Sequence, residues 1–502
     1  MIPLTLGEVA AICGGELLDA GPGTVVTGVA CDSRTVRRGE LFVGLRGERF
    51  DGDAYAAQAL ERGAAAVVVR RETATRLTGR PRVAVGDGVA ALGQLGRAVR
   101  RRSQARVVAI TGSTGKTTTK DILAALLRPV CEVVATRANL NNEVGLPQTL
   151  LETTPRTEVV VAELAMRGPG QIRELARLAL PDIAVITAVA PVHLEFVGTL
   201  DDVAAAKAEL IEELDGGTVV VPGDGGPLAP HVRRHRGRVV TFATPESDVR
   251  FVSVERRGPG TRVLADAFTQ RAALDFNFTG DHYLYDAQAA LAAFVELGFR
   301  LDEARTGAAA VTFSGLRGET VELADGGLLL NDAYNANPRA TRAALDHLVG
   351  LAAGRTMVAV LGDMYELGPS APAYHSAVGE HAARLGVRLV AVGDLGRHYL
   401  TGAPGERWFP TVEECVAALS EVVPPGSAVL VKASRALRLE RVADAVLAAA
   451  GGPAGGAAAA APDRRWTALR RRRTRATPLA RARARPVAPT AAPPSGPCRP
   501  TA

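Results

Sequence analysis

Short apolar runs alternate with segments of helical periodicity along most of the chain. A first group of apolar runs spans residues 107–110, 159–162 and 183–189. A second group lies near residues 328–330, 357–361, 388–392 and 428–431. Strands that alternate with helices predict parallel sheets built from strand–helix–strand units. The predicted fold class is therefore α/β.

The same pattern divides the chain into three folded units, which is about the number expected for 502 residues. Residues 1–103 form the first unit, and the run 64–69 within it predicts a strand. Residues 104–316 and 317–451 contain the two groups of strands. The charged stretch 97–106 is typical of a linker between the first two units.

The final segment, residues 452–502, is rich in Ala, Pro, Gly and Arg, and we expect it to be disordered because it cannot bury enough apolar surface. It holds eleven arginines and one aspartate, a net charge of +10; because the whole chain has +6, the preceding residues carry −4. A folded body of that charge argues against specific nucleic-acid binding. The tail is either dispensable or an arm that touches anionic partners non-specifically.

Three further features limit the class of protein. No run approaches the ~20 apolar residues of a membrane span. The N-terminus lacks the charged and apolar regions of a signal peptide. The five cysteines are far apart and form no CxxC pair, which argues against a disulfide framework or a zinc site. We therefore expect a cytoplasmic protein with no membrane span.

The most informative segment follows the apolar run 107–110. It consists of Gly112, Ser113, Thr114, Gly115, Lys116, Thr117 and Thr118. Two glycines let backbone N–H groups surround phosphate oxygens, and the helix that starts there adds its positive dipole end. Lys116 can reach the outer phosphates, and the hydroxyl of Thr117 can bind Mg²⁺. Ile110 replaces the first glycine of the full phosphate-loop pattern, so the motif is a shortened form.

Polar residues follow several of the predicted strands, where ligands bind in open parallel sheets. They are Glu163, His193, Asp332, Tyr334, Asn335, Asn337, Asp363, Glu366, Lys432, Ser434 and Arg435. Glu163 offers the hard oxygen ligand that Mg²⁺ prefers. His193 lies in the same unit as the phosphate loop, which favours a role at metal or phosphate.

Lys207 lies in a segment, 200–214, that predicts a helix capped by Asp201 or Asp202. It shares the inward face with Val203. If the amine is buried its pKa falls, and a neutral amine can react with CO₂ to form a carbamate, an anionic Mg²⁺ ligand. The periodicity is equally compatible with the alternative, in which the Lys207 amine extends to water.

Over residues 1–451 the chain resembles the Mur ligase family. The matching pieces are the phosphate loop with its flanks (111–120), 139–147, Glu163 with 166–170, His193, 206–207, 332–338, 361–368 and 431–435. The resemblance implies a three-domain architecture, with a central phosphate-loop ATPase domain built on a parallel sheet and a Rossmann-like C-terminal domain. It also implies that domain closure brings the third domain over the nucleotide.

The Tyr-Asn-Ala-Asn-Pro and Gly-Asp-Met-x-Glu-Leu-Gly pieces resemble one subgroup of the family. They imply ligation of D-alanyl-D-alanine to UDP-N-acetylmuramoyl tripeptide through an acyl phosphate, with ATP and Mg²⁺, in peptidoglycan synthesis. The implied catalytic residues are Lys116, Lys207, His193 and Arg317, and the implied metal ligands are Thr117, Glu163, His193 and carbamylated Lys207. The implied nucleotide contacts beyond the phosphate loop are Asn139, His282, Asp286, Asp332, Asn335 and Asn337. Asp32, Ser33 and Arg34 would bind the UDP group.

The chain departs from the family where Gly-x-His-Asn-x-x-Asn is usual, because Tyr283 and Asp286 stand in place of the asparagines. A carboxylate can accept from the adenine amino group but cannot donate to a ring nitrogen. We therefore expect altered ATP affinity or base selectivity. The alternatives are a sister ligase of the folylpolyglutamate or cyanophycin type, a nucleotide-binding regulator without turnover, and a nucleic-acid module built on the tail. We expect a monomer.

Overall fold

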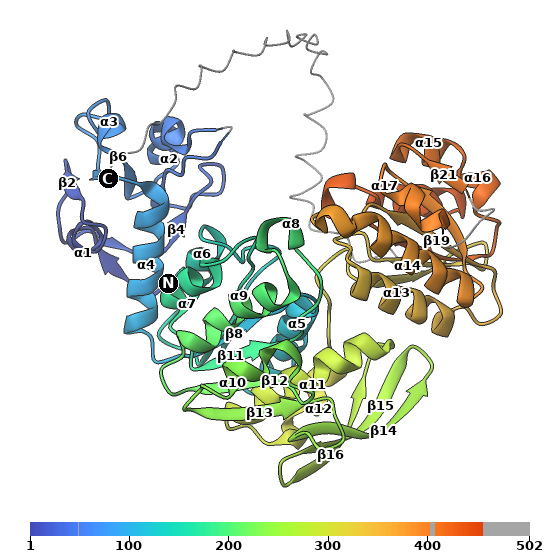
Figure 1. Ribbon diagram of the computed structural model, residues 1–502. Coiled ribbons are helices and arrows are strands. Elements are labelled where there is room, and N and C mark those ends of the chain that lie inside the picture. The colour runs from blue at the N-terminus through green and yellow to red at the C-terminus, as the bar shows by residue number, and fades with distance from the viewer. Residues whose placement is uncertain (49, 402–406, 455–502) are drawn as a thin grey trace, which may run out of the picture. The chain divides into compact units, whose positions relative to one another are not determined.

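The computed structural model describes residues 1–48, 50–401 and 407–454 (Figure 1). The strands of the described residues form a five-stranded, a nine-stranded and a six-stranded sheet, together with a two-stranded pair. We call the three large ones the N-terminal, central and C-terminal sheets. The predicted disordered tail lies outside the described residues except for residues 452–454.

The N-terminal sheet has the strand order β2-β7-β6-β5-β4. Strands β4 to β7 pair in parallel, and β2 pairs antiparallel with β7. The elements of this part are β1 (Leu4–Thr5), α1 (Leu6–Ile12), β2 (Glu16–Leu18), β3 (Val25–Val26), β4 (Val29–Ala30), β5 (Leu41–Val43), α2 (Ala56–Glu61), β6 (Ala66–Arg70), α3 (Arg71–Ala74), β7 (Arg82–Val85) and α4 (Gly88–Arg102).

The linker predicted at residues 97–106 is wrong for most of its length, because α4 continues to Arg102. Asp87 caps this helix by accepting from the backbone N–H of Ala90. Its buried face includes Leu95 and Val99, so the helical periodicity continues beneath the arginines. A run of charge therefore marked the solvated face of a helix.

The central sheet has the order β16-β15-β14-β13-β12-β11-β8-β10-β9. The elements of this part are β8 (Arg106–Thr111), α5 (Lys116–Leu127), β9 (Val133–Ala135), α6 (Gly145–Leu151), β10 (Val159–Glu163), α7 (Gln171–Ala179), β11 (Ile183–Ile186), α8 (Leu194–Val197), α9 (Leu200–Glu212), β12 (Thr218–Pro222), α10 (Ala229–Val232), β13 (Arg238–Phe242), β14 (Val249–Arg257), β15 (Gly260–Ala267), β16 (Gln270–Phe276), α11 (Asp281–Glu296) and α12 (Arg305–Ala308). The strand predicted at 183–189 ends at Ile186.

Strands β8 to β14 pair in parallel, as the alternation of strands and helices predicts. Strands β14 to β16 then continue the sheet as an antiparallel meander, which the sequence analysis did not predict. The end of β14 is exposed on both faces, with Val252 and Val254 each 48% exposed, so this strand lacks the continuous burial of its neighbours. Figure 1 shows β14, β15 and β16 as the outer edge of the central part.

The C-terminal sheet has the order β17-β18-β22-β19-β20-β21, and β17 is its antiparallel strand. Its elements are β17 (Glu319–Glu322), β18 (Leu328–Asn331), α13 (Pro338–Leu351), β19 (Met357–Gly362), α14 (Ala371–Arg384), β20 (Arg388–Val392), β21 (Arg407–Phe409), α15 (Val412–Ala417), α16 (Leu419–Val422), β22 (Ala428–Lys432) and α17 (Glu440–Ala449). All four strands predicted here are present within one or two residues.

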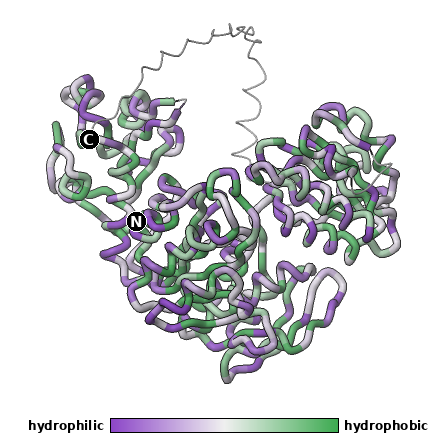
Figure 2. The backbone as a smooth tube through the Cα atoms, in the orientation of Figure 1, coloured by the Kyte–Doolittle hydropathy of each residue, from purple (hydrophilic) through white to green (hydrophobic). Residues whose placement is uncertain are grey.

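Hydrophobic clusters lie on both faces of the central sheet. One cluster packs α5 and α11 against one face, and the other packs α7 and α9 against the opposite face. Burial on both faces is the reason the parallel strands read as continuous apolar runs. Figure 2 shows hydrophobic and hydrophilic segments following one another along the surrounding helices, as expected for helices with one buried face. Within the described ranges, no helix is both long and apolar enough to cross a lipid bilayer.

Replacement of Leu291 by Ala tests the α5–α11 packing. Leu291 is fully buried in the cluster that also contains Ile122 and Phe294. We expect Leu291→Ala to lower the free energy of unfolding by about 2–5 kcal/mol in urea titrations, because it removes buried methyl groups and leaves a cavity. The matched control Val252→Ala, on exposed β14, should change it by less than about 0.5 kcal/mol. Equal effects of the two variants would contradict this assignment of the core.

Candidate active site

The phosphate loop connects β8 to α5 at the carboxyl edge of the central sheet. Gly112 and Gly115 have φ angles of 153° and 80°. A Cβ atom on Gly112 would lie 2.0 Å from Oγ1 of Thr187, and one on Gly115 would lie 2.2 Å from Oδ1 of Asp286. Only glycine fits at these two positions. The amine of Lys116, at the first turn of α5, donates to the carbonyl of Gly112 at 2.7 Å.

Glu163, the last residue of β10, lies directly beside this loop. Its carboxylate is buried and accepts from the hydroxyl of Thr117 at 2.8 Å and from the side-chain amide of Asn141 at 2.8 Å. The structure thus brings together Thr117 and Glu163, two of the residues expected to hold metal. Asn139, expected to contact the nucleotide, lies exposed two positions before the asparagine that reaches Glu163.

The donor set around Glu163 fits Mg²⁺. Mg²⁺ is usually held by one or two carboxylates together with waters and substrate phosphates, not by an all-protein cage. Accordingly, the described part of the chain contains no group of three His, Cys, Asp or Glu side chains arranged to hold a metal. Glu163 and Thr117 supply hard oxygens at the start of α5, where phosphate oxygens would complete the coordination.

Lys207 faces the same site from α9, and its side chain is buried, only 2% exposed. The amine therefore does not extend to water, and a carbamate on Lys207 stays a prediction. Burial holds the pKa of Lys207 well below its usual range, and the positive charge of Lys116 lowers that pKa further. The predicted cap of this helix is wrong: Thr199 caps α9 and Asp202 is its partner in a capping box.

His193 lies in the loop after β11 and has a left-handed backbone conformation, with φ 55°. Its Nδ1 atom lies 2.5 Å from Oε2 of Glu366, which follows β19 in the C-terminal part. This hydrogen bond lowers the pKa of the Glu366 carboxyl. The structure therefore connects His193 to a carboxylate that the sequence analysis placed at a strand end without a role.

Arg317 approaches the phosphate loop from the segment before the C-terminal sheet. Its guanidinium lies over the ring of Tyr334, 3.9 Å from the centroid. Burial lowers the pKa of Lys116, the carboxylate of Glu163 opposes this shift, and the charge of Arg317 adds to it. Lys116 thus lies near the buried carboxylate of Glu163, the guanidinium of Arg317 and the amine of Lys207, and the charges of Lys116 and Arg317 suit anionic ligands.

The residues expected to contact the nucleotide after β18 differ in their surroundings. Asp332 forms a 2.5 Å ion pair with the buried amine of Lys432, the last residue of β22. Lys432 also donates to the carbonyl of Asn335, whose own side chain is exposed. Asn337 caps α13, because its side-chain oxygen accepts from the backbone N–H of Ala340 at 2.9 Å. The sequence pattern points to Lys432 but not to this pairing.

Helix α11 carries His282, Tyr283 and Asp286 toward the site. Burial raises the pKa of the Asp286 carboxyl to about 7, although Arg339 and the hydroxyl of Thr118 oppose the shift. Burial and neighbouring His347 hold the pKa of His282 well below its usual range. The ring of Tyr283 packs on that of His282, with ring centroids 3.8 Å apart. The two residues that depart from the family pattern are therefore both buried.

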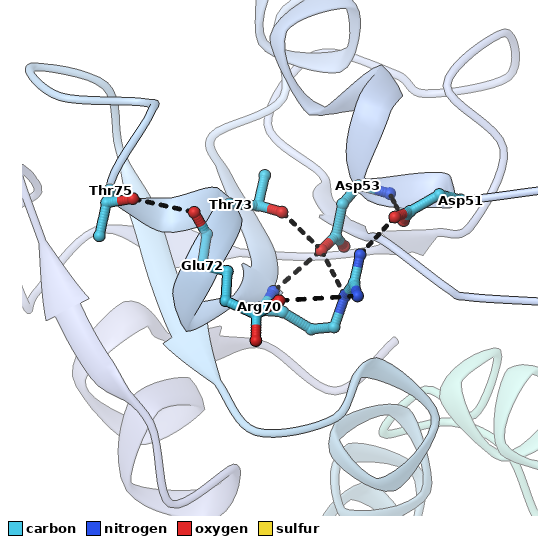
Figure 3. A network of polar contacts seen from close by, with 6 residues as sticks. All are labelled: Asp51, Asp53, Arg70, Glu72, Thr73 and Thr75. Atoms are coloured by element: carbon cyan, nitrogen blue, oxygen red, sulfur yellow. Dashed lines mark hydrogen bonds and ion pairs between the residues drawn. The ribbon is translucent and has the colours of Figure 1, made fainter.

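The carboxyl edge of the N-terminal sheet carries Asp32, Ser33 and Arg34 directly after β4. Arg34 pairs with Asp32 at 2.6 Å on the surface, whereas the buried hydroxyl of Ser33 donates to Gln58 at 2.7 Å. Along the same edge lies a cavity of about 370 Å³, lined by Gly44, Arg46, Arg70, Arg71, Glu72, Val85, Gly86, Asp87 and Gly88. Figure 3 shows how Asp51 and Asp53 fix the guanidinium of Arg70 beside it.

Comparison with known proteins agrees with this arrangement. Family models described as the Mur ligase family catalytic domain, the Mur ligase middle domain, and the Mur ligase glutamate ligase domain match residues 25–105, 110–294 and 316–435. The chain is 33% identical over 454 residues to the UDP-N-acetylmuramoyl-tripeptide–D-alanyl-D-alanine ligase of Bacillus subtilis. The aligned region covers 88% of this chain and 98% of the relative.

Two solved structures show the same fold. MurF from Acinetobacter baumannii is 29% identical with a TM-score of 0.81, over 88% of this chain and 98% of that one. MurF from Thermotoga maritima, solved in complex with ADP, is 30% identical with a TM-score of 0.74, over 84% and 97% of the two chains. The sequence expectation of a three-domain α/β architecture is confirmed. This chain belongs to the Mur ligase family.

Proposed function

We propose that this protein is an ATP-dependent ligase that joins D-alanyl-D-alanine to UDP-N-acetylmuramoyl tripeptide, the reaction named for its relatives. The observation that carries the proposal is the pair of basic side chains, Lys116 and Arg317, at the phosphate loop beside the buried Glu163. Formation of an acyl phosphate brings a carboxylate against a triphosphate, and two anions approach only where cations neutralise them.

In the proposed reaction the terminal carboxylate of the tripeptide attacks the γ-phosphate of ATP and releases ADP. The amine of D-alanyl-D-alanine then attacks the acyl carbonyl, and inorganic phosphate leaves as the amide forms. Lys116 would hold the outer phosphates, while Glu163 and Thr117 would hold Mg²⁺, which withdraws charge from the phosphoryl oxygens. Asp32, Ser33 and Arg34 would bind the UDP group at the N-terminal sheet.

Lys207 and His193 would complete the metal site. We propose that the neutral amine of Lys207 adds to CO₂, releasing one proton and leaving an anionic carbamate. Burial of Lys207 next to Lys116 supports this, because both effects keep the amine uncharged and reactive. The cytoplasmic location and monomeric state expected from the sequence stay predictions, as do the domain boundaries at residues 103, 316 and 451.

The reaction is tested by measuring ADP release from the purified protein with Mg²⁺-ATP, the UDP-linked tripeptide and D-alanyl-D-alanine, omitting each in turn. Release that requires all three substrates, with a pentapeptide product by mass, would establish the ligase. ATP binding without such release would identify a nucleotide-binding regulator, and Tyr283 and Asp286 would become the leading explanation.

Lys116 provides the first prediction from this proposal. We expect Lys116→Met to lower kcat/KM about 10²- to 10³-fold in the ADP-release assay, because the developing charge on the outer phosphates loses its nearest cation. Arg305→Met, at an exposed position of α12, is a matched control that should retain activity. If Lys116→Met retained full activity, the assignment of the phosphate loop as the reaction site would be wrong.

Asp286 gives a prediction about pH. The folded chain keeps the Asp286 proton up to a pKa of about 7, whereas the unfolded chain releases it near pH ~4. Between these values the folded state binds more protons, so the free energy of unfolding falls as pH rises, by up to about 1.4 kcal/mol per pH unit. Asp286→Asn should remove this contribution, and its stability relative to wild type should therefore increase from pH ~4 to ~7.

Urea titrations at a series of pH values check this expectation. The exposed Asp275, on β16, supplies a matched Asp→Asn control for the effect of the substitution itself. Parallel stability curves for wild type and Asp286→Asn would show that the carboxyl titrates normally in the folded chain. In that case the close approach of the Asp286 carboxyl to Gly115 would need an explanation other than a buried, protonated carboxyl.

A further inference from the structure

The contact between His193 and Glu366 joins two loops that are distant in sequence. His193 follows β11 of the central sheet, and Glu366 lies between β19 and the 3₁₀ turn η4 (Gly368–Ser370) of the C-terminal part. Nδ1 of the imidazole and Oε2 of the carboxylate are 2.5 Å apart. Both side chains are partly buried, with 22% and 31% of their surfaces exposed.

Both residues have a backbone conformation that side chains of L-amino acids seldom adopt. The φ angle is 55° at His193 and 64° at Glu366. Non-glycine residues in this left-handed region are uncommon, and such strain persists only where the surroundings hold it, often at functional sites. Two strained residues that meet through their side chains indicate that the contact has a specific purpose.

The surroundings fix the carboxylate as well as the imidazole. Arg167 approaches the other oxygen of Glu366, with 4.0 Å between its Nε and Oε1. The backbone N–H of Glu195 points to the carbonyl of Glu366, with 3.5 Å between the nitrogen and the oxygen. A Cβ atom added to Gly368 would lie only 3.6 Å from the backbone of Glu195, so the two loops are in close contact.

We propose that Glu366 is a positioning residue that orients His193 for metal binding. A carboxylate only accepts hydrogen bonds, so Nδ1 of His193 must carry the proton, and in the neutral ring Nε2 keeps the lone pair that binds a metal. Carboxylates that accept from the outer nitrogen of a metal-binding histidine fix its tautomer and ring orientation. The inference rests on the proposed function through the assignment of His193 as a metal ligand.

This arrangement makes the metal site depend on two parts of the chain. Glu163, Thr117 and Lys207 all come from the central part, whereas Glu366 comes from the segment after β19. Orientation of His193 therefore requires that the loop after β19 contact the loop after β11. Metal affinity would report on that contact, independently of whether any ligation takes place.

The test measures binding of Mn²⁺ to the full chain in the presence of ADP by electron paramagnetic resonance. We expect Glu366→Ala to weaken Mn²⁺ binding about 10- to 100-fold, which is the usual effect of losing such a partner. Glu366→Gln, which keeps an acceptor oxygen without the charge, should restore part of the affinity. Glu195→Gln is the matched control and should bind as wild type does, because Glu195 contacts Glu366 through its backbone only.

The same measurement in a His193→Ala background separates positioning from direct binding. If Glu366 acts through His193, adding Glu366→Ala to His193→Ala should weaken binding no further. Unchanged affinity of the single Glu366→Ala variant would overturn the inference, and so would an equal loss with and without His193. Thermal unfolding of each variant identifies any loss that comes from misfolding.

The outcome is distinguishable from a failure of the proposed function. If the protein released no ADP but Glu366→Ala still weakened Mn²⁺ binding through His193, the ligase proposal would fail and the positioning role would stand. If the protein ligated normally and the Mn²⁺ affinity of Glu366→Ala equalled that of wild type, the positioning role alone would fail.

Discussion

The parallel pairing of β8 with β10 on one side and β11 on the other is the constraint on which the site depends. The register sets Glu163 opposite Ile110 and Ile186 opposite Thr111, so all three strands end at the same level of the sheet. A shift of one residue would turn Glu163 to the other face. The hydrogen-bond ladders between these strands therefore place three features at one edge of the sheet: the phosphate loop, Glu163 and the loop that carries His193.

A second constraint is the concentration of cations at that edge. The charge of Lys116 lowers the pKa of Lys207, and the charge of Arg317 lowers the pKa of Lys116. Glu163 alone does not balance them. Such a site is less stable alone than with anions bound, so phosphates and carboxylates should stabilise the folded chain by mass action. Binding of anionic substrates therefore relieves the unfavourable free energy of burying these amines, which strengthens substrate binding.

The sequence predicted the parts of the fold that local pattern determines. The strands that end at Thr111, Glu163 and Lys432 are predicted within one or two residues, because buried parallel strands are continuous apolar runs. The linker prediction is wrong at α4, because the arginines there lie on the solvated face of a helix and not in a linker. At α9 a Thr cap was overlooked beside two aspartates. The β14–β16 meander escaped prediction because its exposed strand has no continuous apolar run.

Within the site, residue types were predictable but partners were not. Asn141 lies within the segment 139–147 and Lys432 is named after its strand, yet only the folded chain shows that they bind Glu163 and Asp332.

The sequence separation of the contacts at the site has a consequence for biosynthesis. Thr117 meets Glu163 46 residues later, Thr111 meets Thr187 76 residues later, and His193 meets Glu366 173 residues later. Since domains fold as the ribosome releases them, a nascent chain would complete its phosphate loop early and its histidine contact late, so an unfinished polypeptide would lack the full reaction centre.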